Sequence, residues 1–180
     1  MWPWEHVAFG YLCYSVYRNA LYGSAPSDRA AVAVVVASVS PDLVDKPLSW
    51  SVGLFPAGYA IGHSVFTLAA LAGVAVAFVV GYSSHLLGDV VYPVLRGGGL
   101  APERVLWPLV TLPPYGDRLG PFSRSLVYLH RYVGAALSGE GSIAAAAGVG
   151  LVFLVGGLWV YDGAPGTWIS RSTDTSPDRP

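Results

Sequence analysis

The chain has 180 residues, a formal net charge of −1 and one cysteine, Cys13. The length suits a single domain, the near-neutral charge gives no indication of nucleic-acid binding, and one cysteine excludes an internal disulfide and a cysteine-based metal cluster. Hydrophobic residues make up 53% of the chain and charged residues only 12%, which is about half the share of a soluble domain. This composition indicates a membrane protein.

The first two apolar segments predict two helices. Pro3 suits the opening turn of a helix over residues 4–22. A second helix is expected from residue 27 or 28 to Val44. Its valines also allow a buried strand, but its alanines and its length favour a helix. A loop rich in glycine and proline is expected over residues 45–62.

A long apolar stretch and a polar insert follow. The stretch covers residues 63–93, and the insert covers residues 96–141 and holds most of the arginines. A short helix is expected in the insert near residues 122–137. Together these segments predict an all-α, membrane-associated bundle of four to five helices.

The last apolar segment is the strongest candidate for a membrane span. Residues 143–161 form nineteen positions without a charge, which is long enough to cross the hydrocarbon core. The polar residues 162–180, rich in proline and serine, are expected to be disordered. Residues 1–161 are therefore expected to form one helical membrane domain.

His85 and Asp89 are the most informative pair in the chain. They lie four residues apart within an apolar stretch, so on a helix both side chains occupy one face. Burying a charge in an apolar setting is costly unless the charge is paired or bound to a metal. Histidine and aspartate are natural ligands of zinc and similar divalent ions. The pair therefore predicts half of a metal site.

His6 and Asp42 can lie at one height in the bundle. If the first two helices form an antiparallel hairpin about Gly23, the two residues are almost equally far from the turn. A shared site requires this match.

His63 can join them only if the chain reverses. One unbroken helix would separate His63 from His85 by roughly 33 Å. A hairpin near Gly73 would bring both histidines to similar heights, although the turn signal there is weak. The alternatives are this hairpin, which we favour, or a metal site without His63.

Each of these residues also has an ordinary structural interpretation. His6 alone could lie at an interface, Asp42 alone could end a helix after Pro41, and His63 alone could belong to a helix cap. Their joint placement at one end of the expected bundle favours a metal site there, because ionisable groups within membrane segments are usually functional. His130 has no such neighbours and is expected to be a solvated residue of the insert.

The ordered set of polar motifs resembles the YdjM-like inner-membrane-associated family of metal-dependent hydrolases. The resemblance covers most of residues 1–110 and is carried by His6 and by residues 41–45 (PDLVD), 62–64 (GHS), 81–89 (GYSSHLLGD) and 106–109 (LWPL). It implies an integral protein of the inner membrane with a divalent metal ion, most simply zinc. The implied metal-site residues are His6, Asp42, His63, His85 and Asp89.

Metal-activated water attacking a phosphoester or another ester is the expected chemistry. Asp45, three residues after Asp42, and Glu5, beside His6, are the candidates for the catalytic base or for a second ligand. Both could instead orient the histidines. The substrate could be a membrane lipid or a lipid-linked group. The competing interpretation is a non-catalytic membrane protein with a structural metal or a metal-free polar cluster.

Overall fold

All regular structure in the described part of the chain is helical. The computed structural model describes residues 1–71, 73–117, 119–138 and 142–167. Its helices are α1 (Pro3–Tyr22), α2 (Asp28–Trp50), α3 (Val65–Ala70), α4 (Val76–Leu95), the short 3₁₀ helix η1 (Pro102–Val105), α5 (Pro121–Ser138) and α6 (Ser142–Tyr161).

The prediction of an all-α fold is confirmed. The described residues contain six α-helices, more than the four to five expected; the long apolar stretch supplies two of them, α3 and α4, on either side of the expected reversal. Most of the tail that we expected to be disordered, residues 168–180, lies outside the described residues.

Local sequence signals explain how the first two helices are bounded. Pro3 lies in the first turn of α1, and the Trp2 backbone N–H donates to Glu5 Oε2 at 2.8 Å. Gly23 ends α1 in the left-handed region, at a φ of 58°, which favours glycine. Ser27 caps α2, where its hydroxyl accepts from the Ala30 N–H.

The predicted end of α2 at Val44 is wrong. The helix continues to Trp50 and contains both Pro41 and Pro47. Proline in a helix interior costs about 3 kcal/mol, so the sequence there resembles a turn. A hydrogen bond from the Ala60 N–H to Asp45 ties the end of α2 to the following loop and compensates for this cost. The loop therefore begins only at Ser51.

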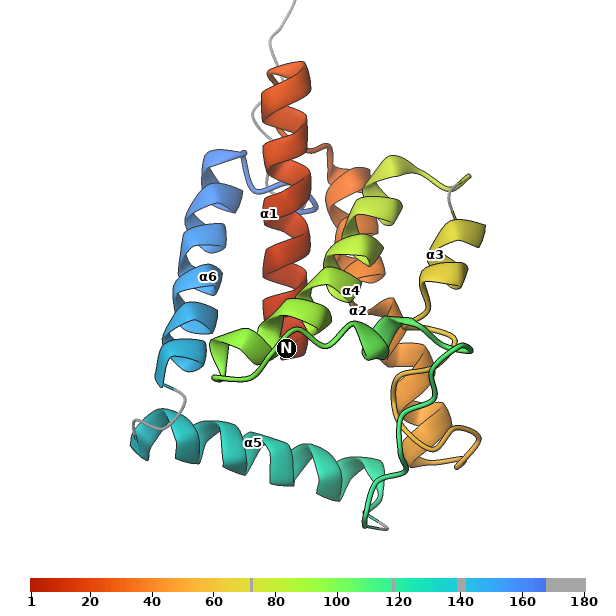
Figure 1. Ribbon diagram of the computed structural model, residues 1–180. Helices are drawn as coiled ribbons and strands as arrows, with labels where there is room; N and C mark the ends of the chain where they lie inside the picture. The colour runs from red at the N-terminus through yellow and green to blue at the C-terminus, as the bar shows by residue number, and fades with distance from the viewer. Residues whose placement is uncertain (72, 118, 139–141, 168–180) are drawn as a thin grey trace, which may run out of the picture.

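The predicted reversal near Gly73 is confirmed. Helix α3 ends at Ala70, α4 begins at Val76, and the two helices pack against each other. Figure 1 shows the chain turning back between them.

Helices α1, α2 and α4 form the centre of the molecule, with α6 beside α1 and α5 lying across the lower end (Figure 1). Helices α2 and α4 approach closely at Gly81, where an added Cβ would lie 2.7 Å from the Val34 carbonyl oxygen. This approach positions the site, because α2 and α4 carry most of its side chains.

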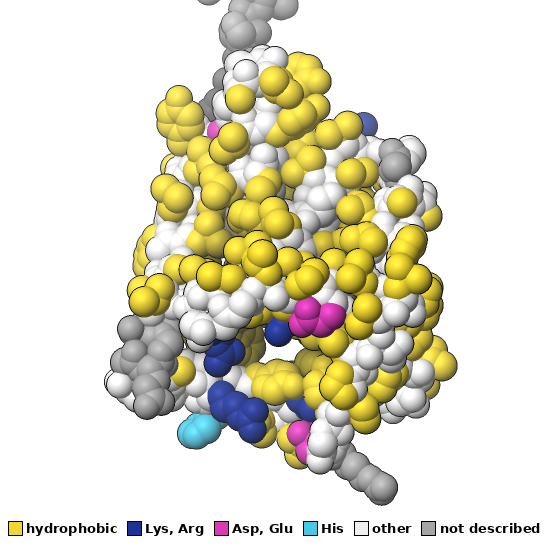
Figure 2. Space-filling model, viewed as in Figure 1, with side chains coloured by type: hydrophobic (Ala, Val, Ile, Leu, Met, Phe, Trp, Pro, Cys, Tyr) yellow, Lys and Arg dark blue, Asp and Glu magenta, His cyan; other side chains and the backbone are white. Residues whose placement is uncertain are grey.

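Among the described residues, two helices are long and apolar enough to cross a membrane by length and composition. They are α4, over Val76–Leu95, and the Ile143–Tyr161 part of α6. Apolar side chains also cover most of the face that Figure 2 shows.

Candidate metal centre

Four buried side chains from three segments converge on one point. Asp42 comes from α2, His63 precedes α3, and His85 and Asp89 come from successive turns of α4. One ligand atom of each side chain lies within 4.8 Å of the others. This group could hold a metal ion.

The distances between these atoms match the edges of a small coordination polyhedron. His63 Nε2 lies 3.1 Å from His85 Nε2, 3.3 Å from Asp42 Oδ1 and 3.5 Å from Asp89 Oδ2. His85 Nε2 lies 3.8 Å from Asp42 Oδ1 and 3.6 Å from Asp89 Oδ2. Atoms bound to one tetrahedral ion at about 2.0–2.1 Å are separated by roughly 3.3–3.4 Å.

The outer nitrogens of the two histidines are held by acceptors. His63 Nδ1 lies 2.8 Å from Asp45 Oδ2, and His85 Nδ1 lies 2.7 Å from the Ser38 carbonyl oxygen. A carbonyl oxygen only accepts, so the His85 proton is on Nδ1 and the lone pair of Nε2 points into the cluster. Metal-binding histidines are typically oriented in this way.

The two carboxylate oxygens of Asp42 have different surroundings. Its Oδ2 pairs with the Lys46 ammonium, one turn further along α2. Its Oδ1 is buried and has no hydrogen-bonding partner among the described residues. This oxygen lies 3.3 Å from His63 Nε2, so its charge is compensated either by a proton on that nitrogen or by a cation at the centre of the group.

The electrostatics of the cluster favour positive charge. Burial lowers the pKa of His63, but the carboxylates of Asp42, Asp45 and Asp89 outweigh burial and raise this pKa to about 10. Without an ion, a proton on His63 balances part of the negative charge. The same carboxylates would attract a divalent cation, so the residues fit a metal site.

Asp45 is fully occupied by hydrogen bonds. Besides His63 Nδ1, it accepts from the backbone N–H groups of Ala60, Gly62 and His63 at 2.6, 2.8 and 3.0 Å. Burial raises the pKa of Asp45, but these donors outweigh it and lower this pKa below its ordinary value. These contacts favour the orienting role over the role of base.

His6 lies beside the four-residue group rather than within it. Its Nε2 is 3.3 Å from Asp89 Oδ1, and its ring stacks on His85 with centroids 3.7 Å apart. The Met1 amino nitrogen contacts the same Asp89 oxygen at 3.0 Å. His6 as a fifth ligand stays a prediction.

Glu5 is fully buried and points toward α6. One oxygen accepts from the Trp2 N–H, and the other would lie 2.0 Å from a Cβ added at Gly148. These contacts indicate a role in packing α1 against α6. His130, expected to be solvated, is exposed on α5.

Three contacts around the site were not predicted. Lys46 pairs with Asp42, the Arg104 guanidinium donates to the Asp89 carbonyl at 3.1 Å, and Tyr59 packs edge-on against His63 at 4.7 Å. Lys46, four residues after Asp42, could have been found from helical spacing. Arg104 lies in the short 3₁₀ helix η1 and Tyr59 in the loop before α3, so no helical periodicity relates either residue to the cluster.

No protein-family model matches the chain significantly, and neither does a curated protein or a solved structure.

Proposed function

We propose that this chain is a membrane-bound, metal-dependent hydrolase of the YdjM-like kind. A divalent ion, most simply zinc, would be held by Asp42, His63, His85 and Asp89, near one end of a bundle integral to the inner membrane. The observation that carries the proposal is the convergence of two Nε2 atoms and two carboxylate oxygens, with both Nδ1 atoms held by acceptors.

The types of ligand atom favour a catalytic metal site over a structural one. Structural zinc sites are usually built from cysteine thiolates, whereas catalytic sites use histidine with carboxylate ligands. The only cysteine, Cys13, is not in the group. The chemistry therefore resembles that of hydrolytic centres.

Each part of the site would have a separate task. When bound, the ion would lower the pKa of a coordinated water toward neutrality and so supply a nucleophile. Asp45 and the Ser38 carbonyl hold the imidazoles, and Lys46 holds Asp42. The cations of Lys46 and Arg104 beside the cluster suit a negatively charged phosphoester, including one carried by a lipid.

A structural metal is the second candidate. If the four protein ligands completed a tetrahedral shell, no position would remain for water, as in closed zinc sites; the hydrolase requires a further coordination position on the ion. A metal-free cluster is the third, because a protonated His63 among carboxylates is stable without an ion.

Metal analysis of the purified protein separates these candidates. We expect about one divalent ion per chain in the wild type, loss of the ion in His85→Ala, and an unchanged content in His130→Ala, which alters an exposed histidine on α5. The wild type should then be tested on a panel of phosphate and carboxylate esters, with and without chelator.

The outcomes are distinct. A wild type without stoichiometric metal would leave the metal-free cluster as the explanation. Metal retained without hydrolysis of any ester would favour the structural site. Hydrolysis that is lost on chelation and restored by metal is the result expected for the enzyme.

A further inference from the structure

Helix α5 carries an apolar stripe that faces away from the molecule. Five large side chains recur at intervals of three or four residues and are between 41% and 84% exposed: Phe122, Leu126, Leu129, Val133 and Leu137. This spacing places them on one side of the helix. We call these five residues the α5 stripe.

The opposite side of α5 packs inward through a charged residue. Arg124 is only 3% exposed; its guanidinium lies over the Tyr115 ring at 4.0 Å and over the Trp50 ring at 5.8 Å. It also donates to Asp117. A surface helix of a soluble domain has the reverse arrangement, with its apolar side inward.

The surroundings of α5 indicate what covers the stripe. Helix α5 lies across the end of α6 and contacts it (Figure 1). Helix α6 is long enough to cross a membrane and exposes large apolar side chains, such as Phe153 at 78%. Both α5 and α6 therefore expose large apolar side chains.

Positive charge gathers at the level of α5. Figure 2 shows more Lys and Arg than Asp and Glu side chains around a hollow just above α5, whereas the face above this level carries few charged side chains. Arg131 is also exposed on α5 itself. Basic side chains at the level of α5, below an apolar protein surface, match a bilayer boundary where anionic headgroups adjoin the acyl chains.

We propose that α5 lies in the plane of the membrane–water interface, with the α5 stripe seated in lipid. Helices of this kind enter only about 5–10 Å into the headgroup–acyl boundary. Helix α6 would cross the bilayer, and α5 would mark one of its surfaces.

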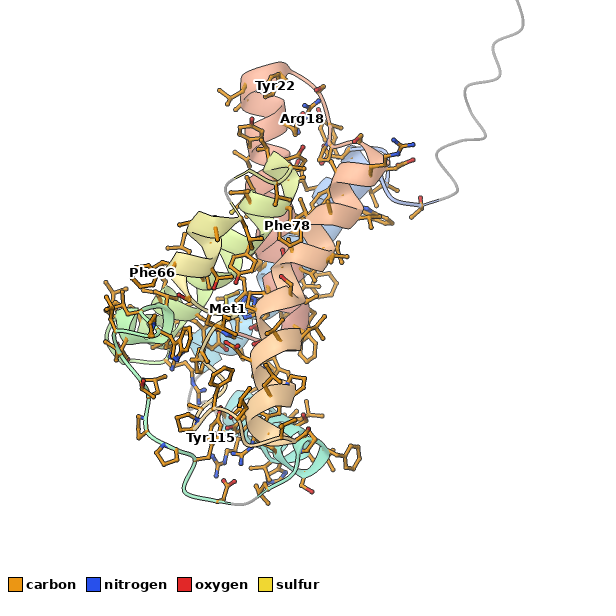
Figure 3. All side chains as sticks on the ribbon, turned by 90° about the vertical axis from the view of Figure 1, so that its right-hand side faces the viewer. Met1, Arg18, Tyr22, Phe66, Phe78 and Tyr115 are labelled. Carbon is orange, nitrogen blue, oxygen red and sulfur yellow. The ribbon has the colours of Figure 1, made fainter. Side chains whose placement is uncertain are left out.

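This position would set the depth of the metal centre. Arg124 lies over the Trp50 ring, Lys46 lies over the same ring at 5.7 Å, and Lys46 pairs with the candidate ligand Asp42. Figure 3 shows Tyr115 at this lower end of the molecule, away from Tyr22 at the far end of α1. On the basis of the proposed function, the bond to be hydrolysed would lie at headgroup level, as in an amphiphile with a phosphorylated headgroup.

Site-specific fluorescence tests the position of α5. Single cysteines, introduced into a Cys13→Ser background, would carry an environment-sensitive fluorophore in vesicles of phosphatidylcholine and phosphatidylglycerol. Leu126→Cys and Leu129→Cys probe the stripe. Gly134→Cys, where an added Cβ meets nothing within 4 Å, is the matched α5 control, and Phe153→Cys reports insertion of α6.

We expect stripe labels to show blue-shifted emission and quenching by nitroxides near the headgroup end of the acyl chains. The Gly134 label should stay accessible to aqueous quencher, and the Phe153 label should be quenched from deeper nitroxides. Water-accessible stripe labels would overturn the proposal, as would stripe labels shielded from both lipid and water, which would indicate a second copy. The measurement needs no metal. The position of α5 can therefore be disproved while the proposed hydrolase activity holds, and the activity can be disproved while the position of α5 holds.

Discussion

Asp45 shows how one buried side chain can organise two parts of a site. It holds three backbone N–H groups of the loop before α3 and the Nδ1 atom of His63, so the loop and the imidazole are positioned together. A carboxylate with so many donors is poorly suited to accept a further proton. Its contribution to the site is therefore expected to be orientation.

Asp45→Asn tests this role. The amide replaces an acceptor with a donor that faces other donors, so we expect metal affinity to fall about 10–100-fold. Metal binding should weaken rather than vanish, because the four candidate ligands remain. Competition with a chelator of known affinity measures the change.

Asp162→Asn is the control, because Asp162 accepts from Tyr11 and Ser15 and is not among the candidate ligands. It should leave metal affinity unchanged. Full metal affinity with lost hydrolysis in Asp45→Asn would instead support Asp45 as the catalytic base.

Glu5→Gln tests the other predicted catalytic residue. The amide oxygen can still accept from the Trp2 N–H, so we expect metal content and any ester hydrolysis to remain at wild-type levels. Glu5→Ala should lower stability by about 0.5–2 kcal/mol through loss of this cap. Normal metal content with no hydrolysis in Glu5→Gln would restore a catalytic role.

His85 and Asp89 could be predicted because their spacing is local: the four-residue interval specifies a common face of α4. Asp42 and His63 lie in other segments, and they were predicted from matched heights along helical hairpins and from the family resemblance. The acceptor for His85 Nδ1 is the Ser38 carbonyl, which every residue type possesses, so no sequence pattern could indicate it.

At the scale of elements, the approach of α2 to α4 controls the site. Gly81 allows this approach, because a Cβ there would lie 2.7 Å from the Val34 carbonyl and 3.0 Å from the Ala37 Cβ. The Ser38 carbonyl that holds His85 lies on the same part of α2. Separating the helices should therefore disturb the candidate metal ligands.

Gly81→Ala should destabilise the protein by about 1–3 kcal/mol through overpacking, and should also weaken metal binding. Gly134→Ala is the matched control on α5, where nothing lies within 4 Å, and it should stabilise by about 0.5–1 kcal/mol. Thermal unfolding in detergent measures both. Equal unfolding temperatures for the two variants would mean that the contact at Gly81 relaxes without cost.

Some element boundaries could be predicted and others could not. The reversal near Gly73 followed from requiring His63 and His85 to meet, and their Nε2 atoms lie 3.1 Å apart. The end of α2 depended on Asp45 reaching Ala60 and Gly62, fifteen and more residues along the chain. Such contacts override the local signals of Pro41 and Pro47.

At the scale of the molecule, the candidate ligands join segments that are distant in the sequence. Asp42 belongs to α2, His63 to the following loop, and His85 and Asp89 to α4. An ion bound to all four would link α2 to α4 in the folded state, whereas the unfolded chain would bind it weakly. Metal binding should therefore stabilise the whole fold.

Chelation measures this linkage. At a free metal concentration of about 100 times Kd, binding contributes about 2.7 kcal/mol to the free energy of unfolding. For a chain of this size, removing the metal should lower the unfolding temperature by roughly 5–10 °C, and adding metal back should restore it. His85→Ala should unfold at a temperature that chelator does not change, because it lacks one of the four ligands. A wild-type unfolding temperature unaffected by both chelator and metal would mean that protonated His63 alone holds the cluster together.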